Sequence, residues 1–354
     1  MNKLIISNHY DLVNYCAKKG ITIEEFNEPV EISKDAYCIR LFEGCETFNQ
    51  PVEIPEGITD CSGMFEGCKS FNQLIVIPDS VEACDYMFIG CSSLNCLVSW
   101  SSRSNCYTCD CMFFGCTSFN QSIILPPKVE NCDAMFERCE SFNQSVIFSA
   151  SVKSCRSMFE KCTSFNQCIT IPGSVENCSR MFEECTSLNS EVIISKGKDQ
   201  RDCFRMFAYC TSFNRSVQIP CGVTNCKEMF MGCKSFDKPI VLPNSVTTTV
   251  RMFKDCVSFN QEIKLSKYLT NITEMFAGCT SFNKPVSFYI VNKKEYKAPI
   301  KIDGEDMWIR RAEGIRYDNI LAGCISFDEQ VLIKGLEDIS EVIGNKNAKI
   351  AFKS

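Results

Sequence analysis

Cysteine is the residue type in this sequence with the greatest capacity for chemistry. The 354 residues include 27 cysteines but one histidine, His9. In a chain under ~100 residues this cysteine content would indicate a secreted disulfide scaffold, but a chain of this length buries enough surface on folding to need no such cross-links. An odd number also cannot pair completely within one chain. With a single histidine, the commonest general base and the commonest nitrogen ligand of zinc are absent from any site away from His9.

The cysteine spacing follows an internal repeat. Met-Phe pairs recur from Met64 to Met275 at intervals of 23 or 25 residues, and residues 71–93, FNQLIVIPDSVEACDYMFIGCSS, show one complete unit. Twelve cysteines lie three residues after the phenylalanine position of the pair: Cys45, Cys68, Cys91, Cys116, Cys139, Cys162, Cys185, Cys210, Cys233, Cys256, Cys279 and Cys324. Nine more lie three residues before the methionine position: Cys38, Cys61, Cys84, Cys109, Cys132, Cys155, Cys178, Cys203 and Cys226.

These two cysteine columns are interpreted as buried, reduced thiols. In two later units Thr249 and Ile272 occupy the column before methionine. Isoleucine can be neither a metal ligand nor a disulfide partner, so the column is a small apolar filler, as buried free cysteine is. Disulfides between neighbouring units and a metal-thiolate array are the alternatives.

One segment breaks the cysteine pattern. Cys106, Cys109 and Cys111 form the sequence CYTCDC, and Cys96 precedes them in the adjoining strand position. This is the one place where the spacing is compatible with a metal or redox site. The alternative is an irregular unit in which two inserted residues disturb the register.

The repeat unit predicts a solenoid. In NQPVEIP, Val52 and Ile54 fall on one side and Glu53 on the other, which is the period of a strand, and the next proline ends it. The Met-Phe segment has spacings suited to one or two turns of 3₁₀ or α-helix. Each unit is too small to bury its own apolar side. The expected fold is therefore a right-handed parallel β-solenoid of about thirteen coils with short helical segments.

The expected organisation has three parts. Residues 1–25 form an N-terminal cap, in which Asn8 begins a helix over 9–19 that ends at Gly20 and turns Leu12, Val13 and Cys16 toward the first coil. Residues 26–333 form the solenoid, with an insertion at 289–319. Residues 334–354 form a C-terminal cap with a short helix near 336–343 and a strand near 348–352.

Two candidate partner-binding surfaces follow from this arrangement. One is the outward position of the first strand, where large aliphatic residues recur as Val76, Ile124, Ile147, Ile193 and Val241. Close sheet packing or cover by a second copy are the alternatives for this stripe.

The other candidate is the insertion, where Asp303-Gly304 predicts a hairpin turn. It carries residue types enriched at binding hot spots: Trp308, Arg310, Arg311 and Tyr317. The alternative for the insertion is a cap or decoration folded onto the solenoid.

Two further columns are predicted to be structural. Asparagine follows the repeated phenylalanine in most coils, and aspartate replaces it at Asp237 and Asp328. A short acceptor at each corner can satisfy backbone groups of its own and adjacent coils. Charged residues after Met-Phe, such as Glu137, Arg138 and Glu183, are expected to form a solvated face.

Composition limits the possible partners and location. The net charge of −6 is unfavourable for binding nucleic acid, and no apolar run approaches the ~18 residues of a membrane span. The first residues also lack the ~7–15 apolar residues of a signal peptide. We therefore expect a reducing, cytoplasmic location with no membrane span.

The units resemble the BspA-like leucine-rich repeat family. The resemblance rests on the segments MFEGCKSFNQ, MFEKCTSFNQ and MFAGCTSFNK, which are separated by IPDSV or IPGSV. It covers nearly the whole chain. The resemblance implies a leucine-rich-repeat solenoid, and its bacterial and protist members are regarded as surface adhesins and interaction proteins. This chain departs from them in its cysteines and in lacking an export signal. Both departures favour an intracellular version, including a viral one in host cytoplasm or virion.

The predicted function is a non-catalytic protein-protein interaction scaffold without a cofactor. The first alternative is a virion or assembly structural protein that self-associates, and the second is a cysteine-based metal or redox protein. An enzyme is not expected, because no position combines a nucleophile, a base and an orienting group.

Overall fold

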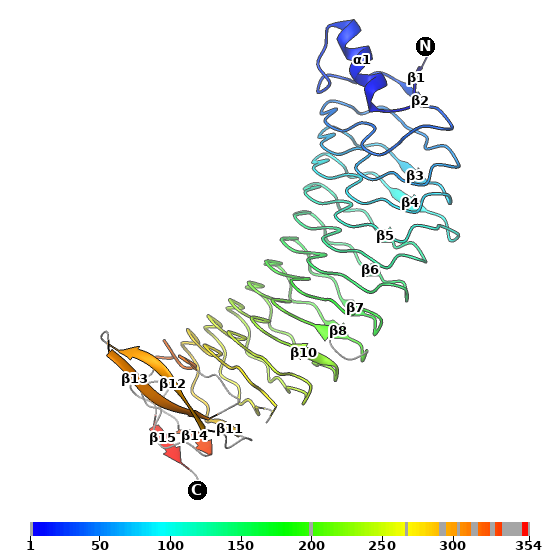
Figure 1. Ribbon diagram of the computed structural model, residues 1–354. Coiled ribbons are helices and arrows are strands. Elements are labelled where there is room, and N and C mark those ends of the chain that lie inside the picture. The colour runs from blue at the N-terminus through cyan, green and yellow to red at the C-terminus, as the bar shows by residue number, and fades with distance from the viewer. Residues whose placement is uncertain are drawn as a thin grey trace.

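The computed structural model describes residues 3–197, 201–265, 268–289, 295–302, 305–312, 318–325, 330–334 and 349–352. The chain forms a parallel β-solenoid of about 10 turns, bent into an arc (Figure 1). The count of thirteen from the phenylalanine column is higher because that column includes both ends. Phe26 packs against a residue of the N-terminal helix, Tyr15, and Phe327 lies outside the described residues.

The N-terminal helix has the predicted bounds and caps, and a strand that was not predicted precedes it. Strand β1 (Leu4–Ile6) pairs in parallel with β2 (Val30–Ile32), and helix α1 (His9–Lys19) lies between them in sequence. Asn8 accepts from the backbone of Tyr10 in a capping box, and Gly20 ends the helix in the left-handed conformation. Leu12 and Cys16 are buried, but Val13 is exposed, because it lies on the flank of the helix rather than beneath it.

The strands of the coils are short and pair two by two. Strand β3 (Ile75–Ile77) pairs with β4 (Val98–Trp100), β5 (Ile123–Ile124) with β6 (Val146–Ile147), and β7 (Ile169–Ile171) with β8 (Val192–Ile194), all in parallel. In β3, Ile75 and Ile77 are buried on either side of an exposed residue, which confirms the predicted alternation. Strand β9 (Arg201–Asp202) pairs with β10 (Val223–Asn225).

Hydrogen-bonded turns form where short helices were expected. In the coil around Phe65, alternate backbone N–H groups donate within the coil, as from Met64 to Cys61 O at 3.1 Å. The groups between them donate to the next coil, as from Phe65 to Met87 O at 2.8 Å. A helix would need every N–H for its own turn, so sharing with the next coil replaces helices with stacked turns.

Two rows of phenylalanine rings fill the core. The rings of Phe136 and Phe142 lie 4.4 Å apart within one coil. From coil to coil, the ring centroids of the Met-Phe row are closer than those of the Phe-Asn row, for example 5.6 Å for Phe136–Phe159 and 6.2 Å for Phe142–Phe165. Coils therefore approach most closely at the Met-Phe turns, and the solenoid bends toward them. Figure 1 accordingly shows β3 to β8 along the outer side of the bend.

The C-terminal part departs from the regular repeat. Strands β11 (Val286–Tyr289), β14 (Gln330–Lys334) and β15 (Lys349–Phe352) form one parallel sheet, and β15 confirms the strand expected near 348–352. Strands β12 (Glu295–Ile302) and β13 (Glu305–Ala312) pair antiparallel up to Ile302 and Glu305. This pairing confirms the predicted hairpin, although the turn residues 303–304 and the helix predicted near 336–343 lie outside the described residues.

Candidate interaction surfaces

The predicted aliphatic stripe is exposed to solvent along the strand side. The exposed fractions are 58% for Val76, 80% for Ile124, 75% for Ile147, 47% for Ile193 and 81% for Val241. The residues that flank them are buried, except for the half-buried Phe148. The alternation of the short strands directs Val76, Ile124, Ile147 and Ile193 outward, and Val241 is exposed at the same place in a coil without an assigned strand. Within this chain the stripe is therefore not covered by sheet packing.

The stripe is a series of patches rather than a continuous band. Ile124 and Ile147 are direct partners in the register of β5 and β6, so their side chains lie next to each other. Val76 is instead paired with Ser99, and Ile193 with Thr170.

A second apolar patch lies beside Val76 and was missed in the sequence. Leu74 and Leu97, each one residue before a strand, are both exposed. This patch could have been predicted from the sequence, because most other coils have a polar or small residue at this place in the repeat.

The insertion is described only in part. Trp308, Arg310 and Arg311 lie in β13, where their backbones face Pro299, Lys297 and Tyr296 of β12. Tyr317 and the side chains of the hairpin lie outside what the structure describes. The hairpin thus remains a candidate by sequence alone.

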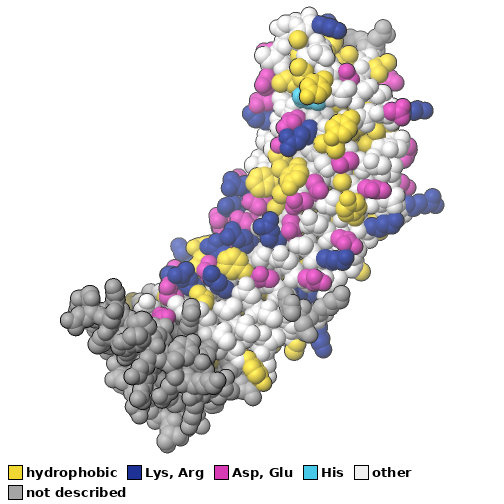
Figure 2. Space-filling view, in the orientation of Figure 1, with side chains coloured by type: hydrophobic (Ala, Val, Ile, Leu, Met, Phe, Trp, Pro, Cys, Tyr) yellow, Lys and Arg dark blue, Asp and Glu magenta, His cyan; other side chains and the backbone are white. Residues whose placement is uncertain are grey.

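The charged residues at the Met-Phe turns are only partly solvated, contrary to the prediction. They lie along the inner side of the bend, where Figure 2 shows basic and acidic side chains gathered. Glu183 is 3% exposed, and Glu160 and Glu228 are also buried. The close approach of the coils at these turns removes the carboxylates from water.

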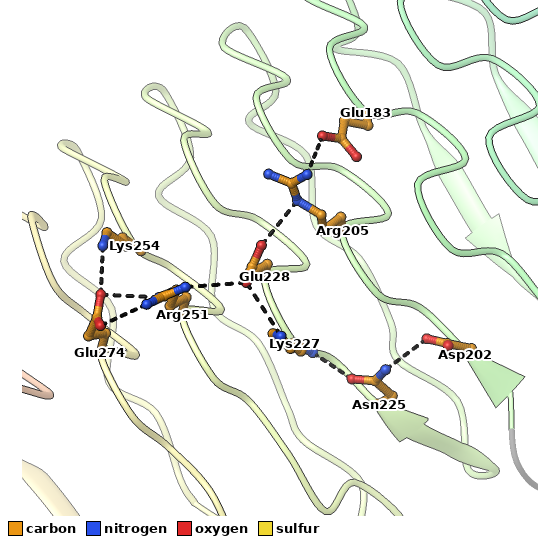
Figure 3. Close-up of polar contacts among 9 residues, drawn as sticks. All are labelled: Glu183, Asp202, Arg205, Asn225, Lys227, Glu228, Arg251, Lys254 and Glu274. Carbon is orange, nitrogen blue, oxygen red and sulfur yellow. Dashed lines mark hydrogen bonds and ion pairs between the residues drawn. The ribbon is translucent and has the colours of Figure 1, made fainter. Parts of the chain in front are cut away.

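Glu183 and Glu228 belong to an ion-pair ladder that crosses several coils (Figure 3). Arg205 bridges Glu183 at 2.9 Å and Glu228 at 3.1 Å. Arg251 continues to Glu274 at 3.0 Å, and Lys254 reaches the same carboxylate at 2.6 Å. Each link joins adjacent coils, so the ladder ties the solenoid together along its inner side.

The two ends of the ladder differ in their electrostatics. Burial raises the pKa of Glu183 to about 7, and nearby Arg205 only partly opposes this effect. Hydrogen bonds from Arg251 and Lys254 lower the pKa of Glu274 to about 2.

The cysteine columns are packed inside the solenoid as predicted. All 27 cysteines are free thiols, and among the members of the two columns every one is buried. The column after Phe has an additional role, because its thiols donate to a carbonyl of the preceding coil, as from Cys139 to Phe113 O at 3.0 Å. Burial raises the pKa of Cys178 to about 12, which keeps this thiol protonated. Ile272, in the same column before methionine as Cys178, is equally buried.

The CYTCDC segment does not bring its surplus cysteines together. The Cys96 thiol donates to Asn72 O, and the Cys111 thiol is directed at Asp110. Cys106 instead faces inward, with its sulfur 3.6 Å from that of Cys109. Among the described residues, no cluster of three or more His, Cys, Asp or Glu side chains is arranged to hold a metal ion.

A shallow groove opens on the surface next to this segment. It has a volume of about 540 Å³ and is lined by Glu82, Asn105, Tyr107, Pro127, Lys128, Glu130 and Ser151. Lys128 Nζ is 2.7 Å from Asn105 Oδ1, so the basic group is already engaged by a neighbouring coil. This groove could not be predicted from the repeat, because residues of several coils line it.

The corner asparagines form a ladder of hydrogen bonds between coils. Asn143 Oδ1 accepts from the backbone N–H of Asn166 at 2.9 Å, and Asp237 accepts in the same way from Asn260. This confirms the predicted structural role of the column toward the adjacent coil.

The comparisons with known proteins assign the chain to a family. The profile described as "Mycoplasma protein of unknown function, DUF285" matches residues 36–147, 125–219 and 221–299, which together exceed half of the chain. The chain belongs to the DUF285 family. No curated protein sequence matches this DUF285 protein significantly.

Solved structures agree on the fold. A leucine-rich repeat protein from Bacteroides ovatus is similar with a TM-score of 0.53 and 18% identity, over 92% of this chain and 88% of that one. A leucine-rich cell surface protein from Faecalibacterium prausnitzii has a TM-score of 0.50 and 20% identity, over 92% and 84%. The DUF285 protein is therefore a leucine-rich-repeat solenoid, as the resemblance implied. None of its described helices has the length and apolar character needed to cross a bilayer.

Proposed function

We propose that this DUF285 protein is a non-catalytic scaffold that binds another protein through the outer aliphatic stripe. The observation that carries the proposal is the adjacent pair Ile124 and Ile147, which are 80% and 75% exposed on paired strands. Side chains of this size on a rigid, repeated surface lose little entropy when a partner covers them. Leu74 and Val76 form a separate apolar patch nearer the N-terminal end.

The proposal includes the absence of catalysis and a reducing location. The repeated cysteines, phenylalanines and asparagines are accounted for by packing and by hydrogen bonds between coils. Twenty-seven free thiols are compatible with a reducing compartment. The relative from Faecalibacterium prausnitzii is a cell surface protein, so a surface location is the alternative.

Charge substitutions in the stripe test the binding surface. In the double variant Ile124→Lys/Ile147→Lys the fold should be retained, because Lys264 occupies the same outward position in another coil. The matched control is Thr170→Lys/Gln218→Lys, which adds the same charge at polar positions of the same column. Tagged proteins are used to capture partners from the native host, and partners are quantified by mass spectrometry and then titrated directly.

We expect the isoleucine variant to lose its specific partner and the control to keep it. Equal capture by both variants, with unchanged circular dichroism, would show that the stripe is not the binding surface. Deleting 289–319 tests the hairpin separately. Light scattering of the purified protein distinguishes the self-association alternative, since that alternative requires oligomers that the isoleucine variant abolishes.

A further inference from the structure

Two buried thiols are in contact at the irregular coil, and a third lies near them. Cys84, Cys106 and Cys109 are each fully buried, and the sulfurs of Cys106 and Cys109 are 3.6 Å apart. Cys84 lies near them, and its interaction with Cys106 raises the pKa of the Cys84 thiol. Cys84 and Cys109 are regular members of the column before methionine, so Cys106 is the addition that creates the cluster.

Packing alone does not account for Cys106. It lies three residues before a column cysteine, and in the neighbouring coils this position is a buried valine, as at Val81, Val129 and Val152. A thiol therefore replaces a hydrocarbon at this coil, and its sulfur lies in contact with that of Cys109. The backbone at this coil is also longer, since the interval from Met87 to Met112 is 25 residues rather than 23.

The neighbouring thiols favour the ionised form of Cys106, whose sulfur also lies 3.3 Å from Thr108 O. Hydrogen bonds from Cys109 and Cys84 lower the pKa of Cys106 to about 4, whereas the pKa values of the two donors are raised. A thiolate is the nucleophilic form of cysteine. The regular column thiols differ, since burial keeps them protonated, as at Cys178.

We propose that Cys106 and Cys109 are a redox modification site that forms a reversible disulfide when a peroxide is present. The Cys106 thiolate attacks one peroxide oxygen and breaks the O–O bond, which gives a sulfenic acid and, after protonation, water. The Cys109 sulfur then attacks the sulfenic sulfur as its own proton leaves, and the released hydroxide takes up that proton to form a second water. Two thiols are oxidised, one peroxide is reduced, and a thiol reductant reverses the bond.

The geometry requires only a local movement. A disulfide bond is about 2.05 Å long, so the two sulfurs must close from 3.6 Å, and the cysteines are three residues apart on one chain segment. Trp100 lies beside the cluster. Its buried Nε1 makes no regular hydrogen bond and approaches the Cys84 thiol, so its fluorescence should report a change in the cluster.

The test uses a Cys168→Ser/Cys221→Ser background, which removes the two exposed thiols. The folded protein is treated with hydrogen peroxide, unfolded, alkylated and analysed by peptide mass spectrometry with and without a reductant. We expect a reducible loss of two hydrogens assigned to a bond between Cys106 and Cys109. Trp100 fluorescence should change in parallel when measured in a Trp308→Phe protein.

The matched variant is Cys106→Val, which restores the residue found in the neighbouring coils and should preserve the fold. This variant should form no disulfide and show no fluorescence change on oxidation, while Cys96→Ser should behave like its parent. The proposal is overturned if Cys106 and Cys109 are alkylated equally with and without peroxide. It is also overturned if the new bond joins other cysteines or persists in Cys106→Val.

Discussion

Arg205 Nη1 lies 2.9 Å from Glu183 Oε1, although the two residues belong to successive coils. The carboxylate is almost completely buried, and the guanidinium also approaches Glu228. The inner side of the bend therefore carries charged groups that water reaches poorly. Because such pairs combine attraction with a desolvation cost, their effect depends on pH.

Glu183 should make the protein less stable as the pH rises from about 4 to 7. Its pKa in the folded protein is about 7, above the value of ~4.3 for an unfolded glutamate. In that range the folded state holds a proton that the unfolded chain has released, so stability falls with increasing pH. Glu183→Gln should remove this fall, which amounts to on the order of 3 kcal/mol at most. Urea unfolding at pH 5 and pH 8 measures it.

Glu274 provides the opposite case in the same ladder. Its pKa of about 2 lies below the unfolded value, so it stabilises the fold above pH ~4.3 and this contribution is lost as the pH falls toward 2. The stability difference between the wild type and Glu274→Gln should therefore be largest near neutral pH and shrink in acid. A difference that grows in acid would contradict the assigned ion pairs.

The left-handed residues of the turns should be sensitive to substitution. Gly90 has φ of 71°, and a β-carbon added there would have its nearest neighbour at 3.9 Å. Gly90→Ala should therefore lower the free energy of unfolding only through backbone strain. We expect a loss of ~1–2 kcal/mol in urea unfolding. Gly90→Asn should cost less, because asparagine tolerates this conformation. Equal costs for alanine and asparagine would argue against the turn conformation.

The corner ladder predicts a difference between two substitutions of Asn143. Its Oδ1 accepts from Asn166 N–H and from Gln167 Nε2 at 3.0 Å. Asn143→Ala should cost ~1–2 kcal/mol, because a partly buried backbone donor loses its partner. Asn143→Asp should be nearly neutral, since Asp237 makes both contacts in another coil. Thermal or urea unfolding measures the stability of both variants. Comparable losses of stability would contradict the role of this side chain.

The two phenylalanine rows should differ in their tolerance. Phe136 contacts four other rings, so Phe136→Ala should cost ~3–5 kcal/mol through the cavity it leaves. Phe142→Leu should cost less than ~1.5 kcal/mol, because Leu94 and Leu188 already occupy that row. Chemical denaturation gives both values, and a larger loss for Phe142→Leu would contradict the packing of the rows.

The repeat was enough to predict the solenoid, but not how its turns are built. The alternation of apolar and polar residues located the strands correctly. Asn8 and Gly20 correctly located the two ends of the capping helix. The Met-Phe segment was expected to be helical because apolar spacing does not reveal that alternate N–H groups, such as that of Phe65, bond to the next coil. Such sharing depends on the distance between coils.

The candidate surfaces were predictable to different degrees. The outward direction of Ile124 followed directly from the strand period. The burial of Glu183 did not, because a charge that is exposed on an isolated turn becomes covered only when the bend brings the coils together. The inward position of Cys106 depended on how the inserted residues were accommodated, and the spacing of the cysteines alone could not show that Cys84, rather than Cys96, would be its neighbour.

Thiol titration determines whether the two cysteine columns are reduced thiols that pack the core. In the native protein only the thiols that reach solvent should react rapidly with an aromatic disulfide reagent, namely Cys168 and Cys221, followed by the half-buried Cys96 and Cys111. In denaturant without reductant all 27 should react, with no metal found by elemental analysis. Fewer than 27 reactive thiols in denaturant, by a wide margin, would show that the columns are not reduced. Rapid reaction of most thiols in the native state would show that they do not pack the core.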